Sequence, residues 1–241
     1  MRRITFLMVC SLFVLELAFV FPHSFAIEKS LQGEHDRAIS DYNKALEINP
    51  RDAAAYNNRG LAYGNKGEYD KAISDYNKAL EINPKLAEAY VNRGNTYERK
   101  GEHDRAIADF TNALKINPKL AEAYNNRGNT YDIKGEYDKA VFDYNKALEI
   151  NPEYAEAYYN RGIGYGNKGQ YDRAIADFTD ALKINPKFAQ AYYNRGIAYY
   201  KKGEYDKAWD DVRKAQSLGF QVGLSFLEAL RKASPEKPRS R

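Results

Sequence analysis

The 241-residue sequence contains few of the side chains that enzymes use for chemistry. It has one cysteine, Cys10, and three histidines. Because Cys10 lies in an apolar N-terminal stretch, the rest of the chain can form no disulfide, thiol nucleophile or cysteine metal site. His35 and His103 lie far apart in the sequence and suggest neither a catalytic dyad nor a metal site. We therefore predict no enzyme activity, no metal and no cofactor.

Charge of one sign is also not concentrated anywhere in the sequence. The formal net charge is +4, and acidic and basic residues alternate along the whole chain. This pattern is typical of a solvated surface and provides no basic patch for nucleic acid or anionic lipid. No glycine-rich phosphate loop is present either. The sequence therefore predicts no nucleic-acid partner.

A long apolar run is found only near the N-terminus. Two arginines precede the apolar residues 4–15, and Ala26 ends a short segment that contains small residues. This pattern is typical of a secretory signal peptide, so we predict a signal peptide over residues 1–26 and an exported chain, periplasmic or secreted, without stable membrane insertion after cleavage. The alternative is an uncleaved membrane anchor. It is disfavoured because about 20 apolar residues are needed to span a bilayer and Glu16 interrupts this run.

What the sequence does contain is a 34-residue unit repeated along most of its length. With Ala87 as position 1, position 8 is always glycine and position 32 is proline in all but the last unit. The glycines are Gly60, Gly94, Gly128, Gly162 and Gly196, and the prolines are Pro50, Pro84, Pro118, Pro152 and Pro186. Repetition at this period indicates a stack of similar units in which each contacts its neighbours.

The pattern within the unit predicts two helices joined by a turn. Apolar or small residues at positions 1, 4, 8 and 11 have helical spacing. Glycine at position 15 ends this first helix, because only glycine adopts the left-handed conformation at low cost. An aspartate at position 18 favours the first turn of a second helix. That helix ends at an Asn-Pro pair, since proline cannot continue it.

The residues at these positions resemble the tetratricopeptide repeat family. In the unit that begins at Ala87 they are Tyr90, Gly94, Tyr97, Ala106, Phe110, Ala113 and Pro118. The resemblance implies an all-α fold, a right-handed superhelical solenoid of helix-turn-helix repeats. One departure from the family recurs, because position 7, usually leucine, is arginine in every full unit.

The repeats divide the chain into segments. Five complete repeats occupy residues 53–222, at 53–86, 87–120, 121–154, 155–188 and 189–222. Residues 27–52 form a truncated first repeat with a second helix only, predicted at 36–48, whose uncovered face is either a contact site or a frayed end. Residues 223–233 are amphipathic and predict a C-terminal capping helix. Residues 234–241 predict a disordered tail.

The resemblance implies that the first helices line a concave groove in which position 6 meets ligands. Position 6 is asparagine in every full repeat: Asn58, Asn92, Asn126, Asn160 and Asn194. An amide both donates and accepts hydrogen bonds, so such a row can bind a peptide backbone whatever its sequence. The alternative is that duplicated repeats share asparagine by copying alone.

Apolar and aromatic groove residues are concentrated in the last two repeats. They are Tyr159, Tyr193, Ile163, Ile197 and Tyr200. We predict that they anchor an extended partner segment, because tyrosines bury a large area at low entropic cost. The alternative is that the C-terminal helix folds over the same residues.

The arginine at position 7 is matched by an aspartate at position 23 of each repeat. Because a buried unpaired charge is costly, we predict Arg–Asp pairs between helices, with a role in register and stability. Taken with the lack of catalytic residues, the sequence predicts a non-catalytic adaptor that binds a protein or peptide in the groove. The alternative is a self-assembling homo-oligomeric scaffold that associates through the uncapped N-terminal repeat.

Overall fold

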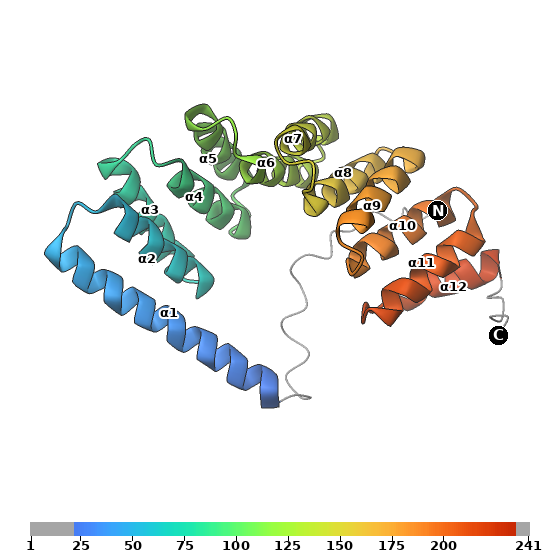
Figure 1. The fold of residues 1–241 in the computed structure, drawn as a ribbon, viewed down its shortest axis with the longest axis horizontal. Helices are drawn as coiled ribbons and strands as arrows, with labels where there is room; N and C mark the ends of the chain where they lie inside the picture. The colour runs from blue at the N-terminus through green and yellow to red at the C-terminus, as the bar shows by residue number, and fades with distance from the viewer. Residues whose placement is uncertain (1–21, 235–241) are drawn as a thin grey trace. The chain divides into compact units, whose positions relative to one another are not determined.

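The computed structural model describes residues 22–234, which form twelve helices and no strand (Figure 1). The helices are α1 Pro22–Ile48, α2 Ala53–Asn65, α3 Tyr69–Ile82, α4 Ala87–Arg99, α5 His103–Ile116, α6 Ala121–Ile133, α7 Tyr137–Ile150, α8 Ala155–Asn167, α9 Tyr171–Ile184, α10 Ala189–Lys201, α11 Tyr205–Ser217 and α12 Leu224–Ala233. The predicted all-α fold class is confirmed. The predicted tail lies outside the described residues apart from Ser234, and so does the predicted signal peptide apart from residues 22–26.

The helices pack in consecutive pairs within two compact parts that divide after Thr130. We call residues 22–130 the first part and residues 131–234 the second part. In the first part α2 pairs with α3 and α4 with α5, while in the second part α8 pairs with α9 and α10 with α11. Second helices also contact the first helix that follows them within a part, as α3 does with α4 and α9 with α10. This is the packing of a tetratricopeptide-type solenoid.

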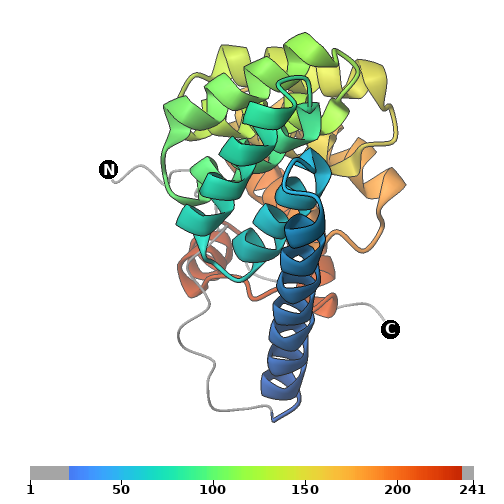
Figure 2. The same ribbon diagram turned by 90° about the vertical axis from the view of Figure 1, so that its left-hand side faces the viewer.

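Helix α1 is longer than the sequence predicts. It begins at Pro22 and runs without interruption to Ile48, whereas the predicted helix began at residue 36 (Figure 2). The glycines at position 15 of the full repeats have φ between 73° and 80° and turn the chain, but Gly33 has no positive φ and lies inside α1. Within the described residues, no first helix precedes Gly33 that would require a turn there. Within residues 22–234, no helix is both long enough and apolar enough to span a bilayer.

The two helices of a repeat approach most closely where a glycine meets an aromatic ring. A Cβ atom on Gly94 would lie 2.8 Å from Cε1 of Phe110, and one on Gly162 would lie 2.7 Å from Cε1 of Phe178. Both rings are fully buried. Positions 8 and 24 therefore fix the distance between the helices of a pair, which explains why position 8 has no side chain.

The last repeat provides a matched test of this contact, because Val212 replaces the aromatic ring. A Cβ atom on Gly196 would have its nearest neighbours at 3.3 Å. We expect Gly162→Ala to lower the free energy of unfolding by about 1–3 kcal/mol through overpacking against Phe178, even though alanine gains about 1 kcal/mol in helix propensity. Gly196→Ala should be less destabilising. Urea unfolding of both variants measures the difference, and equal midpoints would contradict this account.

The predicted C-terminal capping helix is confirmed as α12. It buries Phe226, Leu227 and Leu230 against Trp209 and Val212 of α11. The indole Nε1 of Trp209 also donates a hydrogen bond to the backbone oxygen of Ser234, at 3.0 Å. The apolar face at the end of the second part is therefore covered by the chain itself.

Candidate functional site

The asparagines predicted to bind a partner lie on the first helices of the five repeats, α2, α4, α6, α8 and α10. In each part separately, we call the surface formed by positions 5, 6, 9 and 12 of its first helices the first-helix face. All five asparagines are half-buried, as are Tyr159, Ile163, Tyr193, Ile197 and Tyr200. The sequence therefore placed these residues on the expected elements, but their contacts differ between the two parts.

In the first part the amides bond to one another. Asn92 Nδ2 on α4 donates to Asn57 Oδ1 on α2 at 3.0 Å, and Asn57 Nδ2 donates to Asn58 Oδ1 at 3.3 Å. Asn126 Nδ2 on α6 donates to Asn95 Oδ1 at 2.9 Å. Asn57 is only 2% exposed, so its two bonds satisfy a buried amide. The row of amides thus holds neighbouring first helices in register, a role that the sequence analysis did not assign to it.

These bonds leave some amide atoms open to a ligand. In the part of the chain that the structure describes, neither the Nδ2 donor of Asn58 nor the Oδ1 acceptor of Asn92 has a protein partner. The orientation of both side chains is fixed by their other atom. The first-helix face of α2 and α4 therefore presents a donor and an acceptor in fixed directions.

In the second part, Tyr159 is held by its neighbours. Its hydroxyl accepts a hydrogen bond from Asn194 Nδ2 at 2.8 Å, and its ring lies 4.6 Å from that of Phe188 and 5.8 Å from that of Phe178 between ring centroids. This packing fixes α10 against α8. Asn194 and Tyr159 thus serve the contact between helices, and Ile163 remains half-buried beside them on α8.

The aromatic pocket predicted at Tyr193, Ile197 and Tyr200 is occupied by α12. The ring centroid of Phe226 lies 5.7 Å from that of Tyr193 and 5.5 Å from that of Tyr200, and all three residues pack against the cluster that α12 forms with α11. Burial raises the pKa of Tyr193. The open pocket is therefore not present in this structure, and the alternative, a C-terminal helix folded over these residues, is observed. The physical reason is that a stack ending at α11 would leave Trp209 and Val212 exposed.

Two carboxylates on the first-helix face were missed by the sequence analysis. Glu98 on α4 and Asp132 on α6 both occupy position 12, and neither lies within 4 Å of a cationic group in the described part of the chain. Burial raises the pKa of Glu98, and it raises the pKa of Asp132 to about 6. Asp132 Oδ1 accepts one hydrogen bond, from Asn167 Nδ2 at 3.4 Å. Their signal in the sequence was that position 12 varies between repeats, whereas position 11 is always tyrosine.

The raised pKa of Asp132 predicts a pH-dependent stability. The folded-state pKa of Asp132, about 6, exceeds the ordinary value of 3.8, so protonation of Asp132 stabilises the folded chain. This stabilisation is complete below pH 3.8 and is lost as the pH rises through 6. Asp132→Asn keeps an acceptor for Asn167 and does not titrate. We expect this variant to be more stable than wild type at pH 7 by up to about 3 kcal/mol. Urea unfolding between pH 4 and 7 measures the effect, with exposed Glu156→Gln as control, and parallel pH profiles of Asp132→Asn and wild type would contradict it.

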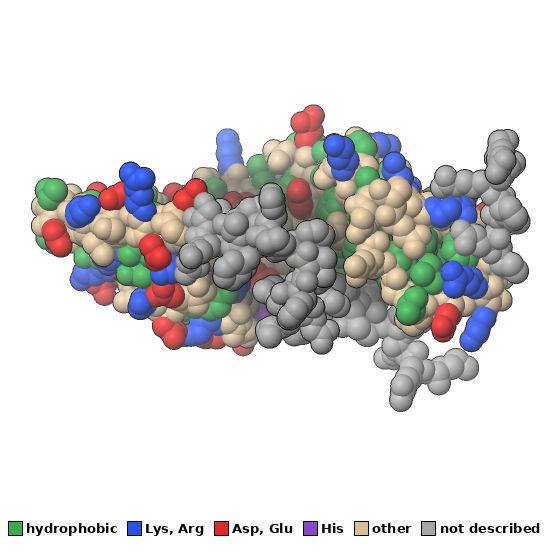
Figure 3. All heavy atoms as spheres, turned by 90° about the horizontal axis from the view of Figure 1, so that it is seen from below, with side chains coloured by type: hydrophobic (Ala, Val, Ile, Leu, Met, Phe, Trp, Pro, Cys, Tyr) green, Lys and Arg blue, Asp and Glu red, His purple; other side chains and the backbone are tan. Residues whose placement is uncertain are grey.

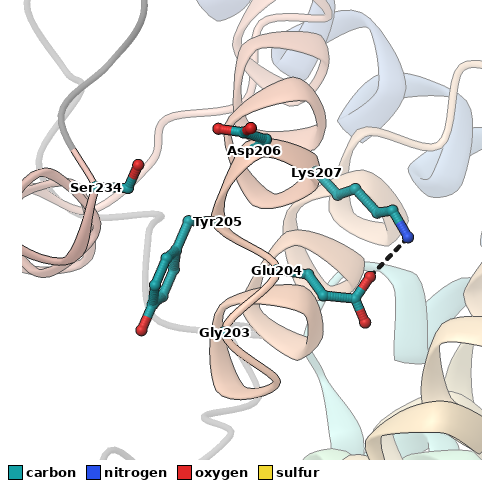
Figure 4. Close-up of a pocket in the computed structure, with 6 residues that line it drawn as sticks. All are labelled: Gly203, Glu204, Tyr205, Asp206, Lys207 and Ser234. Carbon is teal, nitrogen blue, oxygen red and sulfur yellow. Dashed lines mark hydrogen bonds and ion pairs between the residues drawn. The ribbon is translucent and has the colours of Figure 1, made fainter.

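The pockets of the second part show no catalytic arrangement. A surface pocket of about 420 Å³ at the start of α11 is lined by Gly203, Glu204, Tyr205, Asp206, Lys207 and Ser234 (Figure 4). A similar pocket of about 380 Å³ lies at the equivalent turn before α9, so the feature recurs with the repeat. The Glu204–Lys207 pair, with Oε2 and Nζ 2.6 Å apart, recurs as Glu136–Lys139. Both pockets are therefore features of the helix-turn-helix unit.

Charge on the surface follows the repeat as well. Figure 3 shows acidic and basic side chains interspersed on the face that it presents. Among the described residues, no group of three or more histidine, cysteine or carboxylate side chains is placed to hold a metal ion. What the site offers is thus hydrogen bonding by amides and two poorly solvated carboxylates.

Comparison with known families identifies the repeat. Family models described as tetratricopeptide repeat match residues 53–86, 87–120, 121–154, 143–176 and 189–218, and a model described as TPR repeat matches 31–67 and 165–203. No curated protein matches this chain. The predicted resemblance is confirmed.

Several solved structures are similar to the chain. A crystal structure of MamA is 32% identical, with a TM-score of 0.62 over 66% of this chain and 94% of MamA. YrrB, described as a TPR protein with an unusual peptide-binding site, is 28% identical, with a TM-score of 0.64 over 79% of this chain and 97% of YrrB. PilF of Pseudomonas aeruginosa is 25% identical, with a TM-score of 0.69 over 76% of this chain and 85% of PilF.

Proposed function

Since the chain belongs to the tetratricopeptide repeat family, we propose that it is a non-catalytic adaptor that binds an extended peptide or protein segment. The binding surface is the first-helix face of the first part, formed by α2, α4 and the start of α6. The description of YrrB, which has a peptide-binding site on the same fold, supports this function. The second part contributes less to peptide binding, because α12 covers the aromatic residues of its first-helix face.

The observation that carries the proposal is the pair of open amide atoms on α2 and α4. An extended peptide presents N–H and C=O groups at every residue, and each needs a partner when it is buried. Asn58 Nδ2 can donate to a peptide carbonyl, and Asn92 Oδ1 can accept from a peptide N–H. Because Asn57 fixes both side chains, binding orders no further rotamer, which lowers its entropic cost.

Peptides selected from a random twelve-residue library on the wild-type chain provide the test. The double variant Asn58→Ala with Asn92→Ala should bind these peptides with about tenfold lower affinity, because each lost hydrogen bond contributes about 0.5–1.5 kcal/mol. Fluorescence polarisation measures the affinity. Asn112→Ala removes a half-buried amide from the second helix α5 and is the control, which should bind like wild type. The proposal is refuted if no peptide in the library enriches, or if the enriched peptides bind the double variant and wild type with equal affinity.

We also propose that the adaptor works outside the cytoplasm, because residues 1–26 have the pattern of a signal peptide and the remainder has no cysteine. N-terminal sequencing of protein recovered from a secreting bacterial host tests this. The expected first residue is Ile27. An intact chain in the membrane fraction would indicate the anchored alternative, and an intact chain in the cytoplasm would contradict export.

A second candidate function is favoured by one observation, a face of α1 that no described helix covers. Ala38, Tyr42 and Ala45 are only half-buried there. A scaffold that assembles from copies of this chain would cover that face. Sedimentation velocity over a range of concentrations separates the candidates, because an adaptor without its ligand should remain monomeric whereas a scaffold should gain mass with concentration.

A further inference from the structure

Residues 35–48 of α1 have almost the same sequence as α3 but a different environment. Residues 33–50 differ from residues 67–84 at only two positions, where His35 replaces Tyr69 and Arg37 replaces Lys71. In α3 this sequence packs between two first helices, α2 of its own repeat and α4 of the next. Among the described elements, α1 packs only against α2 (Figure 2). One of its two packing faces therefore has no described partner.

Burial identifies which face is open. Ile39 and Leu46, which point toward α2, are 9% and 7% exposed, much like Leu80 in α3 at 8%. On the other face Ala38, Tyr42 and Ala45 are half-buried. Their equivalents in α3 are only 0–1% exposed: Ala72, Tyr76 and Ala79. The open face of α1 is thus the one that a first helix of the same repeat would cover.

The charge on this face is incomplete in a specific way. In the next repeat, Arg59 Nε and Nη2 donate to Asp75 Oδ2 and Oδ1, both at 2.7 Å. The equivalent of Asp75 in α1 is Asp41, which is exposed and lies 3.5 Å from the exposed Lys44 Nζ. A fork-shaped guanidinium fits a carboxylate better than an ammonium does. The open face therefore presents a carboxylate that lacks its arginine.

Shape adds a second requirement. The ring of Tyr76 approaches so closely that a Cβ atom on Gly60 would lie 2.8 Å from it. Tyr42 has the same position in α1, so a helix can pack on it at the same distance only if it has glycine there. Arginine and glycine are adjacent in every first helix of this chain. The face thus requires an Arg–Gly pair near the middle of an amphipathic helix.

We propose that the open face of α1 binds an amphipathic helix of a different polypeptide, which places an arginine on Asp41 and a glycine over Tyr42 and so completes the first repeat. A second copy of this chain is a poorer source of that helix. Arg59, Arg93, Arg161 and Arg195 each pair with an aspartate of their own repeat, and Arg127 also has its partners. A second copy would have to break one of these pairs to donate its helix.

A peptide with the sequence of residues 87–100 is the probe, because it is a first helix of the required kind. A hydrocarbon staple between the Glu88 and Asn92 positions keeps it helical, since short isolated helices are marginal in water. We expect saturable binding to the full chain, with NMR amide shifts at Ala38, Tyr42 and Ala45. Asp41→Asn, or Arg93→Gln in the peptide, should weaken binding at least tenfold, and the two changes together should have no larger effect than either one.

Two controls make the outcome decisive. Glu47→Gln removes an exposed charge from the same helix and should leave the affinity unchanged. Asn58→Ala with Asn92→Ala should also leave it unchanged, which separates this site from the proposed peptide-binding face. The proposal is overturned if the stapled peptide fails to bind, or if binding is indifferent to Asp41 and to the peptide's arginine. It is also overturned if the chain dimerises without peptide and Asp41→Asn abolishes the dimer, because a second copy then occupies the face.

Discussion

Asp109→Ala is expected to lower the free energy of unfolding by about 3–5 kcal/mol, because it leaves a buried guanidinium without its carboxylate. Asp109 and Arg93 have side chains that are 6% and 17% exposed, and they form two hydrogen bonds of 2.7 and 2.8 Å. Without Asp109, the Nε and Nη2 donors of Arg93 lose their acceptors, and only Nη1 keeps its bond to Asn77 Oδ1. Urea unfolding followed by circular dichroism measures the loss.

The chain contains a matched control at the same repeat position. Asp41 is exposed, and among the described residues its ion pair is the surface contact with Lys44. Asp41→Ala should therefore change the free energy of unfolding by less than about 0.5 kcal/mol. Arg93→Leu with Asp109→Leu should recover most of the stability lost in Asp109→Ala, because a buried ion pair can be replaced by apolar residues. Equal losses in the two alanine variants would contradict the role assigned to burial.

The buried pairs show both what the sequence could predict and what it could not. Matching periodicity of arginine and aspartate predicted the pairs, and the structure places them between the two helices of one repeat, as in Arg195–Asp211. The sequence did not predict that the same guanidinium also reaches the preceding second helix, where Arg195 Nη1 donates to Thr179 Oγ1 at 3.0 Å. Burial raises the pKa of Asp211 despite this arginine, so the Arg195–Asp211 pair opposes a desolvation cost.

The repeat also predicted most helix boundaries, since each first helix begins at position 1 and each glycine at position 15 turns the chain. The prediction failed where repetition stops. Gly33 is followed by nearly the same sequence as Gly67, but the residues before it differ, and the turn at Gly67 depends on a first helix that packs back on the second. Local sequence alone could not show that this contact is missing in the described part of the chain.

Prediction of the binding site from the sequence was limited for the same reason, because the contacts of its residues depend on packing. Tyr193 and Tyr200 are residue types typical of a binding surface, and residues 223–233 have the amphipathic pattern of a helix that packs over apolar residues. Sequence patterns show that both are apolar, but they do not show which surface meets which. Similarly, Asp132 differs from an exposed carboxylate only through burial on the first-helix face, which no single position in the sequence reports.

Leu230→Ala is expected to lower the free energy of unfolding by about 2–5 kcal/mol, because Leu230 is fully buried between α12 and α11. Trp209 is the only tryptophan of the chain, and its indole bonds to the backbone just after α12, so its fluorescence reports on this contact. We expect a red shift of its emission together with the lower stability. Leu224→Ala is the control, because Leu224 on the same helix is 75% exposed. Identical spectra and stabilities of the two variants would contradict the covering role of α12.

The same variant decides whether the aromatic residues under α12 can bind a partner. Loosening α12 exposes Tyr193, Ile197 and Tyr200, which the helix otherwise covers. If these residues anchor a peptide, the peptides selected on the wild-type chain should bind Leu230→Ala more tightly, because they no longer compete with α12. If the open amides of α2 and α4 are sufficient, the affinity should be the same in both chains. The comparison therefore separates a groove that α12 partly closes from one that lies wholly in the first part.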